Sequence, residues 1–235
     1  MFGAGQAMGM SVAPAARSST PQQDPRPTPQ PRQAGRTPQA GRTPQQERSR
    51  ATQARLLEAT VECLVEHGWS GTTTTVVAAR AGVSRGAQLH HYPTKTALVT
   101  AAVQHLAERR ADEIRTEAAA LPAGARLDRV VDMLAAAFTS PLFVAALEVW
   151  IAARTDGDLR EALVPLEARV GREMHRLTVE LLDVNEREPD VREAVQATLD
   201  LLRGLGVANL LSDDSARRTV LLAAWKRHLT TIINR

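Results

Sequence analysis

The chain has 235 residues, of which 43% are hydrophobic and 23% charged, and its formal net charge is +3. No run approaches the roughly 18 consecutive apolar residues that a membrane helix needs, so we expect a cytoplasmic protein with no membrane partner. The single cysteine, Cys63, excludes an internal disulfide and a thiolate metal cluster, and three Phe, three Trp and one Tyr are too few for a sheet that stacks single-stranded bases.

Residues 1–46 differ from the rest in composition. They hold eight of the 13 prolines, and the sequence QAGRTP occurs at 33–38 and again at 39–44. Such a segment buries too little apolar surface to offset the entropy cost of ordering, so we predict a disordered tail. Its role is open between an arm whose arginines add weak phosphate contacts and a dispensable extension. The net positive charge lies before residue 96, while residues 96–235 are net acidic, which mildly favours a polyanionic partner.

Beyond the tail, apolar residues recur every three or four positions, and no stretch alternates with period two for long enough to form a strand. This pattern predicts an all-α protein of about nine helices. The first helix is expected over 47–67, where Gly68 would provide a left-handed cap and Trp69 its hydrophobic partner.

Hydroxyl side chains mark the starts of the next three helices. Thr73 and Ser84 are suited to cap two short helices, because their oxygens accept hydrogen bonds from the free N–H groups of a first helical turn. Pro93 ends the second of these helices. Thr94 then precedes a long helix that we expect to reach about residue 120.

Five further helices are predicted in the remainder, over about 126–139, 141–153, 158–181, 190–211 and 215–234. Ser140 is the expected cap of the helix that begins at Pro141, and capping boxes at Asp158 and Asp190 start two others. Pro165 is expected to kink its helix or to delay the start. The helix over 141–153 is apolar on every side except at Glu148, so we expect it to be buried.

The segment 73–92, TTTVVAARAGVSRGAQLHHY, has the layout of a helix-turn-helix. Gly82 can take the positive φ of a tight turn, Ala78 and Ala81 let the two helices approach closely, and Val83 fills their junction. A second helix placed in this way fits the major groove of DNA, where its exposed N-terminal residues meet base edges.

Residues 47–115 resemble the N-terminal domain of the tetracycline-repressor (TetR) family. The resemblance is strongest in GVSRGAQLHHYPTKTAL at 82–98 and continues into the preceding HGWSGTTTTVVAARA at 67–81. It implies a three-helix DNA-binding domain over 47–115, followed over 120–235 by a helical domain for ligand binding and dimerisation. The function that it implies is a homodimeric repressor, released from a palindromic operator in double-stranded DNA by a small-molecule effector.

The resemblance also implies a set of DNA-contacting residues, which lie at the start of the first short helix, along the second and just after it: Thr73, Arg85, Gly86, Ala87, Gln88, Leu89, His90, His91 and Lys95. Gln88 and Leu89 depart from the family pattern, which has an apolar residue and then an aromatic hydroxyl at these places. A small rotation of the helix would exchange the two side chains and let Gln88 pair with an adenine edge.

By the same resemblance, the fourth to seventh helices enclose a ligand cavity. Its expected wall residues are Met133, Phe138, Phe143, Leu147, Glu148, Trp150, Met174 and His175. An apolar cavity with few polar groups suits a small hydrophobic or aromatic molecule. Glu148 has two interpretations, a group that orients the ligand or a structural ion pair with an arginine of a neighbouring helix.

The eighth and ninth helices are expected to pair with a second copy as a four-helix bundle, through Leu201, Leu205, Leu210, Leu221, Trp225 and Leu229. Gly204 and Gly206 would let these helices approach closely. The alternative is that the same residues form a core within one chain.

Enzymatic motifs are missing: the sequence has no phosphate-binding glycine loop, nucleophile elbow or metalloprotease helix, so we expect no enzyme and no cofactor. The pairs Cys63 with His67 and His90 with His91 offer two ligands each, too few for a metal site. Two other functions remain open, a DNA-binding activator and a helical small-molecule-binding protein or enzyme whose helix-turn-helix is only structural.

Overall fold

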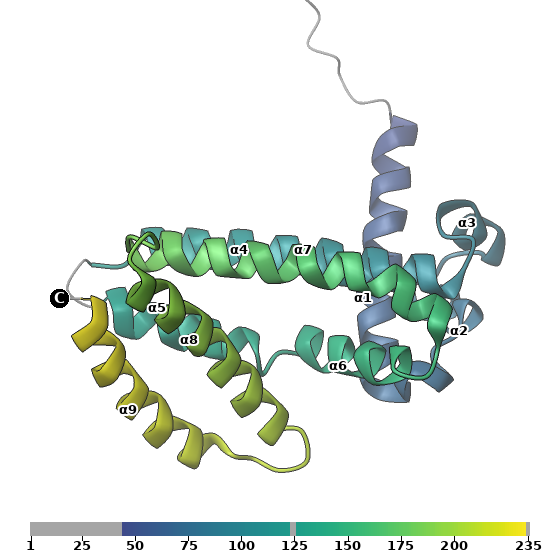
Figure 1. The fold of residues 1–235 in the computed structure, drawn as a ribbon. Helices are drawn as coiled ribbons and strands as arrows, with labels where there is room; N and C mark the ends of the chain where they lie inside the picture. Colours follow the sequence, from purple (N-terminus) through teal and green to yellow (C-terminus); the bar gives the residue numbers. More distant parts are fainter. Residues whose placement is uncertain (1–43, 123–125, 234–235) are drawn as a thin grey trace, which may run out of the picture. The chain divides into compact units, whose positions relative to one another are not determined.

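The computed structural model of the protein describes residues 44–122 and 126–233 (Figure 1). These residues form nine α-helices and no strand, which confirms the all-α class: α1 (Pro44–Gly71), α2 (Thr74–Arg80), α3 (Arg85–His91), α4 (Lys95–Ala119), α5 (Arg126–Ala137), α6 (Pro141–Ala153), α7 (Gly157–Leu182), α8 (Pro189–Ala208) and α9 (Ser215–Ile233). The predicted tail lies outside the described residues, except for positions 44–46, which begin α1.

The predicted caps of α2, α3 and α4 are confirmed. The side-chain oxygens of Thr73, Ser84 and Thr94 accept hydrogen bonds from backbone N–H groups three residues ahead, at N···O distances of 3.2, 3.2 and 3.0 Å. Ser140 caps α6 in the same way, with Pro141 as the first helical residue, where its missing N–H costs nothing. Hydroxyls at these positions therefore fix where four helices start.

Two predicted starts were wrong. Asp156, and not Asp158, caps α7, because the Asp156 carboxylate accepts from the backbone N–H of Leu159 at 3.0 Å. α8 begins at Pro189 without any side-chain cap, so the proline takes the place of the predicted capping box. Pro165 lies inside α7, which continues to Leu182.

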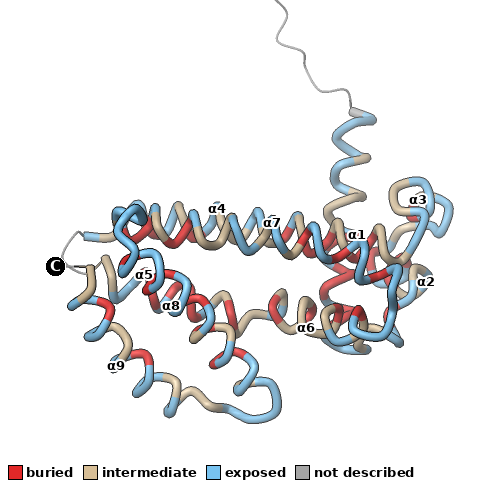
Figure 2. Tube along the Cα trace, in the orientation of Figure 1, coloured by how far each residue is buried: buried red, intermediate tan, exposed pale blue. Residues whose placement is uncertain are grey.

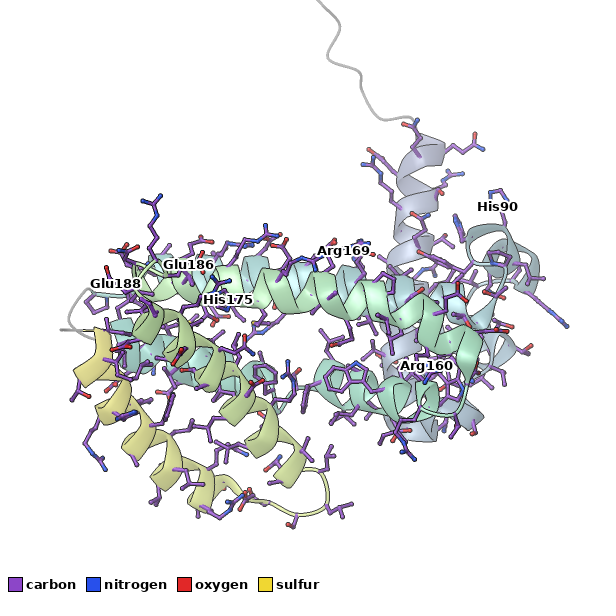
Figure 3. The ribbon with its side chains drawn as sticks, in the orientation of Figure 1. His90, Arg160, Arg169, His175, Glu186 and Glu188 are labelled. Atoms are coloured by element: carbon purple, nitrogen blue, oxygen red, sulfur yellow. The ribbon has the colours of Figure 1, made fainter. Side chains whose placement is uncertain are left out.

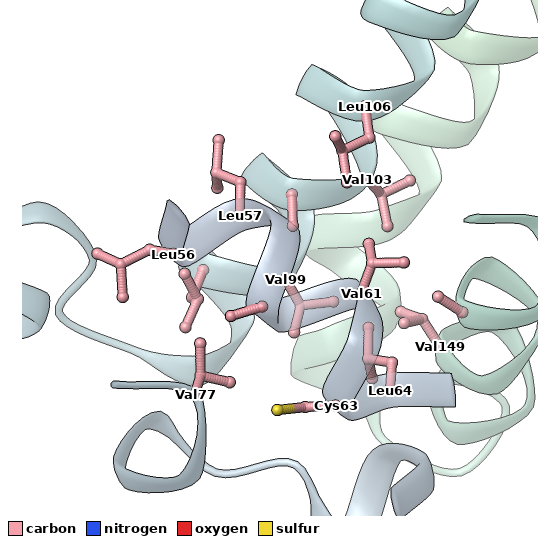
Figure 4. Packing of buried hydrophobic residues seen from close by; sticks show 14 of the residues in the cluster. Leu56, Leu57, Val61, Cys63, Leu64, Val77, Val99, Val103, Leu106 and Val149 are labelled. Carbon is pink, nitrogen blue, oxygen red and sulfur yellow. The ribbon is translucent and has the colours of Figure 1, made fainter. Parts of the chain in front are cut away.

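Two apolar clusters lie inside the described helices. The first joins α1, α2 and α4 to α6 and the start of α7 (Figure 4), and the second joins the end of α4 to α5, α7, α8 and α9. α4 takes part in both, with Leu98 in the first and Ile114 in the second. Buried and exposed positions alternate along the long helices (Figure 2), as expected for amphipathic helices. Because α4 runs through the predicted domain boundary, the division at 115–120 stays a prediction.

No single described helix is long and apolar enough to cross a membrane. α5 and α6 pass the length and composition test only as a pair, which is bent by 52°.

Candidate functional site

The turn between α2 and α3 has the geometry that the sequence indicates. Gly82 has a φ of +62°, and the backbone N–H groups of Gly82 and Val83 donate to the carbonyls of Ala79 and Ala78 at 3.2 and 2.9 Å. These two bonds make a left-handed helix end of the Schellman type. With Val77 buried beneath it, the turn fixes the angle at which α3 leaves α2.

Most of α3 is open to solvent. Arg85, Gly86, Leu89 and His90 are exposed, and Ala87 and His91 are half-buried. In Figure 3, His90 lies on the outer side of α3. Thr73 at the start of α2 is exposed as well. These positions give a basic, accessible helix start of the kind that can enter a groove, and the roles of the individual residues in DNA contact stay a prediction.

The interpretation of Gln88 as a base-reading residue disagrees with the structure. The side chain is 0% exposed, and its Nε2 donates to the carbonyl of Tyr92 at 2.6 Å, while Leu89 is 41% exposed. The helix has not rotated to exchange the two residues. Gln88 instead occupies the buried place where the family pattern has an apolar residue, and its Oε1 has no hydrogen-bond partner.

Lys95 is half-buried and contacts the end of α1. Its Nζ donates to the carbonyl oxygen of Trp69 and lies 3.8 Å from the centroid of the Trp69 ring. Burial lowers the pKa of Lys95, and the nearby charge of Asp156 opposes that shift. Lys95 therefore joins the start of α4 to the end of α1, and its contact with phosphate stays a prediction.

Ion pairs join α2 to α1. The Arg80 guanidinium donates to Glu66 and lies 3.7 Å from Glu62. Cys63 is buried next to this pair, and burial raises the pKa of its thiol. The described residues contain no group of three or more His, Cys, Asp or Glu side chains able to hold a metal ion.

A cavity of about 100 Å³ lies between α4, α6, α7 and α8. Four predicted wall residues line it, Phe138, Phe143, Trp150 and Met174. Four others do not, namely Met133, Leu147, Glu148 and His175. Met133 is buried in the second cluster, and His175 pairs with Glu186 at 2.9 Å on the α7 surface.

The aromatic residues form the cavity's apolar wall. Phe138 and Phe143 meet edge to face at a centroid distance of 5.3 Å, and Phe143 meets Trp150 at 6.1 Å. Such arrangements place the positive edge of one ring on the negative face of the next. Arg203 also lines the cavity and was not among the predicted wall residues. Its guanidinium carbon lies 6.0 Å from the ring centroids of both Phe138 and Trp150.

Glu167 is another polar residue of the cavity wall that was not predicted, as are Arg110 and Ser140. Burial raises the pKa of Glu167, and a side-chain hydrogen bond with Trp150 and the charge of Arg203 act in the opposite direction. Its position could have been found from the sequence, because it lies four residues after Leu163 and three before Val170, on the apolar side of α7.

Glu148 fits neither of its two interpretations. Its carboxylate does not line the cavity, and it forms no ion pair with an arginine of the described helices. It accepts a hydrogen bond from the backbone N–H of Trp69 at 3.3 Å. α6 thus contacts the end of α1 on one side and the cavity on the other.

The predicted dimer residues fall into two groups. Leu205 and Leu229 are buried within the chain, Leu201 is half-buried, and the Trp225 indole donates to Thr198 at 2.9 Å. Leu210 and Leu221 are exposed. Val207, Leu211 and Val220, which were not predicted, are exposed as well. We call the five exposed apolar residues of α8, α9 and their connection the α8–α9 apolar patch: Val207, Leu210, Leu211, Val220 and Leu221.

Gly206 serves a contact inside the chain and does not face outward. A Cβ at this position would lie 2.1 Å from the Phe138 carbonyl oxygen and 2.8 Å from the Phe143 ring, so α8 touches the α5–α6 connection there. A Cβ at Gly204 would meet nothing within 4 Å.

Comparison with known proteins gives one consistent result. The sequence model of the tetR family of bacterial regulatory proteins matches residues 56–102. The HTH-type transcriptional regulator CymR of Pseudomonas putida is 32% identical over 178 residues, which are 73% of this chain and 85% of CymR. A crystal structure from Pseudomonas aeruginosa PAO1, described as a transcriptional regulator, is similar with a TM-score of 0.58 at 29% identity, over 75% of this chain and 89% of that one. The multidrug binding protein EbrR, solved in complex with ethidium, shares the fold with a TM-score of 0.55 at 21% identity, over 77% and 98% of the chains.

Proposed function

Since the chain belongs to the tetR family of bacterial regulatory proteins and is a transcriptional regulator, we propose that it is a homodimeric repressor that leaves its operator when a small hydrophobic molecule binds. The observation that supports this most is the position of α4. Its first residue follows α3 after only Tyr92, Pro93 and Thr94, and further along Val103 and Ala107 line the cavity. One helix therefore connects the DNA-facing element with the ligand cavity.

We assign DNA contact to the exposed positions of α2 and α3. Arg85 supplies a planar guanidinium at the start of α3, and His90 is exposed five residues further along the helix. The Thr73 hydroxyl accepts the capping bond with its oxygen, so its proton remains able to donate to a phosphate. Gln88 and Lys95 are left out of this assignment because their side chains are engaged within the chain. We place the protein in the cytoplasm, where it reaches DNA.

The α8–α9 apolar patch supports a dimer. Its five exposed side chains lie near the connection between two helices that already pack on one another. Two copies joined by this patch around a two-fold axis would present two α3 helices, so we expect a palindromic operator whose half-sites lie one helical turn of DNA apart, about 34 to 36 Å.

The cavity supports an aromatic or otherwise apolar effector. Three aromatic rings line it, and EbrR, which shares the fold, was solved with ethidium bound. Pockets that hold drug-sized ligands measure roughly 300 to 1,000 Å³. This cavity is smaller, so such a ligand must displace side chains or helices when it enters, and that displacement is what would alter the spacing of the α3 helices.

Fluorescence anisotropy with the DNA that flanks the protein's own gene tests this function, with random DNA as competitor and with salt varied. We expect specific binding. The logarithm of the binding constant should fall linearly with the logarithm of the salt concentration, with a slope of about −0.9 per phosphate contact. Arg85→Ala should weaken binding about tenfold or more, because it removes a groove contact. Arg187→Ala, a matched exposed arginine in the α7–α8 connection, should have no effect.

Three results would contradict the proposal. A salt-independent signal no stronger than that of random DNA would favour the helical small-molecule-binding protein. A compound that binds tightly in the cavity and leaves operator affinity unchanged would rule out release by an effector, and activation in a promoter reporter would replace repression.

A further inference from the structure

Trp69 is held by side chains from two other helices. Its backbone N–H donates to the Glu148 carboxylate of α6, and its backbone carbonyl oxygen accepts from the Lys95 ammonium group of α4. The same ammonium group lies over the Trp69 ring, 3.8 Å from the centroid, which is the geometry of a cation–π contact. The end of α1, the start of α4 and the middle of α6 therefore meet at one residue.

The conformation of Gly68 makes this meeting possible. Its φ is +63°, a value that residues with a side chain rarely adopt, and α1 is kinked there. A Cβ at Gly68 would lie 3.0 Å from the Oε2 atom of Glu148. A larger residue would strain the backbone and push the carboxylate away, so the glycine gives Glu148 the space to reach Trp69.

The helix that carries Glu148 also lines the cavity. Phe143, Ala146 and Trp150 face the cavity, and Glu148 does not. All four belong to α6, a helix of 13 residues. Close-packed interiors transmit displacements, so an occupant that moves α6 also moves the Glu148 carboxylate.

On the other side of Trp69, Lys95 is the first residue of α4 and follows closely after α3. Its ammonium group is bound to the carbonyl and the ring of Trp69, so a shift of Trp69 changes what holds the start of α4. A shift at this point reaches α3 through three connecting residues.

We propose that Glu148 is a positioning residue that couples the cavity to α3: its bond to Trp69 passes a displacement of α6 to the start of α4. This inference rests on the proposed function, since it assumes that a filled cavity alters DNA binding. A charged acceptor suits the role, because a hydrogen bond to a carboxylate is stronger than one between neutral groups.

A double-mutant cycle tests the coupling without a known effector. Ala146→Phe fills the cavity from α6, and Ala146→Leu is a milder version if the larger residue unfolds the protein. The readout is the dissociation constant for a DNA duplex that the wild-type protein selects from a random-sequence library. In the wild-type background, we expect the filled cavity to weaken DNA binding about tenfold.

In the Glu148→Ala background, we expect the same filling substitution to change DNA affinity less than about twofold, because the path through Trp69 is cut. Glu148→Gln should restore most of the tenfold effect, since its amide oxygen still accepts from Trp69. The matched control is Glu161→Ala, which removes an exposed carboxylate of α7 and should leave the tenfold effect intact.

An equal loss of affinity in the Glu148→Ala and wild-type backgrounds would overturn the role of Glu148 and leave the proposed function standing. A filled cavity without effect on DNA binding in the wild-type background would overturn the effector response itself, and the coupling with it. Failure to select any duplex would overturn DNA binding.

Discussion

Two surfaces of the molecule differ in kind. Around α3, Val77 and Ala81 of the preceding helix and turn belong to the first cluster. Leu89 is the one large apolar residue of α3 that is exposed, beside the exposed Arg85 and His90. At the connection of α8 and α9, apolar residues remain outside the second cluster, with Leu211 99% and Val220 69% exposed. The first surface suits a polyanion, and the second suits an apolar protein surface, so each surface suits a different partner.

The largest effect is expected where the apolar patch is broken. Leu211→Asp introduces a charge into the proposed dimer contact, and sedimentation should show a monomer. Operator affinity should fall about 100-fold or more, because one α3 helix then binds without the second. Ile151→Asp replaces an apolar residue of α6 that is 62% exposed and should leave a dimer. If Leu211→Asp stayed dimeric, the patch would not be the interface.

The backbone of Gly206 in α8 packs directly on Phe138 and Phe143 of the cavity wall. Gly206→Ala should lower the free energy of unfolding by about 2 kcal/mol, because its Cβ would overlap the Phe138 carbonyl oxygen. Gly204→Ala is the control on the same helix. With open space around it, it should raise stability by up to about 1 kcal/mol. Urea unfolding of both variants gives the comparison, and equal stabilities would show that α8 does not pack closely at Gly206.

In α3, Gln88 is a buried polar residue. Gln88→Leu removes a buried acceptor without a partner and loses one hydrogen bond to Tyr92, so we expect a net gain of about 1 kcal/mol in the free energy of unfolding. Gln196→Leu, at an exposed position of α8, should change it by less than about 0.5 kcal/mol. A clear loss of stability for Gln88→Leu would mean that the bond to Tyr92 outweighs the unpaired acceptor.

The smallest effect concerns Glu167 in the cavity wall. Its pKa in the folded protein is raised above the ordinary value of 4.5, so the folded state binds a proton that the unfolded state has released. Stability from this group is therefore greatest below 4.5 and declines as the pH rises through the raised pKa. Glu167→Gln should remove that decline from pH-dependent unfolding curves. Parallel curves for the variant and the wild type would refute the assignment.

The features that could be predicted from the sequence are local ones. A capping hydroxyl such as Thr73 acts on an N–H three residues away, and Gly82 acts on its own φ, so neither depends on the rest of the fold. The family pattern at Gln88 was also the correct guide to burial. The rotation that would have turned this residue outward requires the apolar Leu89 to become buried, which the packing around α3 does not provide.

Which apolar stripe of a helix faces its own chain could not be predicted. Leu205 and Leu229 pack inward while Leu211 and Val220 remain outside, yet all four look alike in a helical pattern. Glu148 and Glu167 show the same limit for charged residues. Periodicity shows that α6 and α7 are apolar on certain faces. Only the packing of α1 against α6 brings Glu148 to a backbone N–H, and only the packing of α6 and α7 places Glu167 at the cavity.

The burial of Cys63 has a practical consequence. It is the one thiol of the sequence, it is 0% exposed, and burial raises its pKa, so little reactive thiolate forms near neutral pH. Oxidants and maleimide reagents should leave it untouched in the folded protein. A cysteine introduced at an exposed site of α3 would then carry a spectroscopic label alone, and the distance between two labels would report the separation of the α3 helices directly.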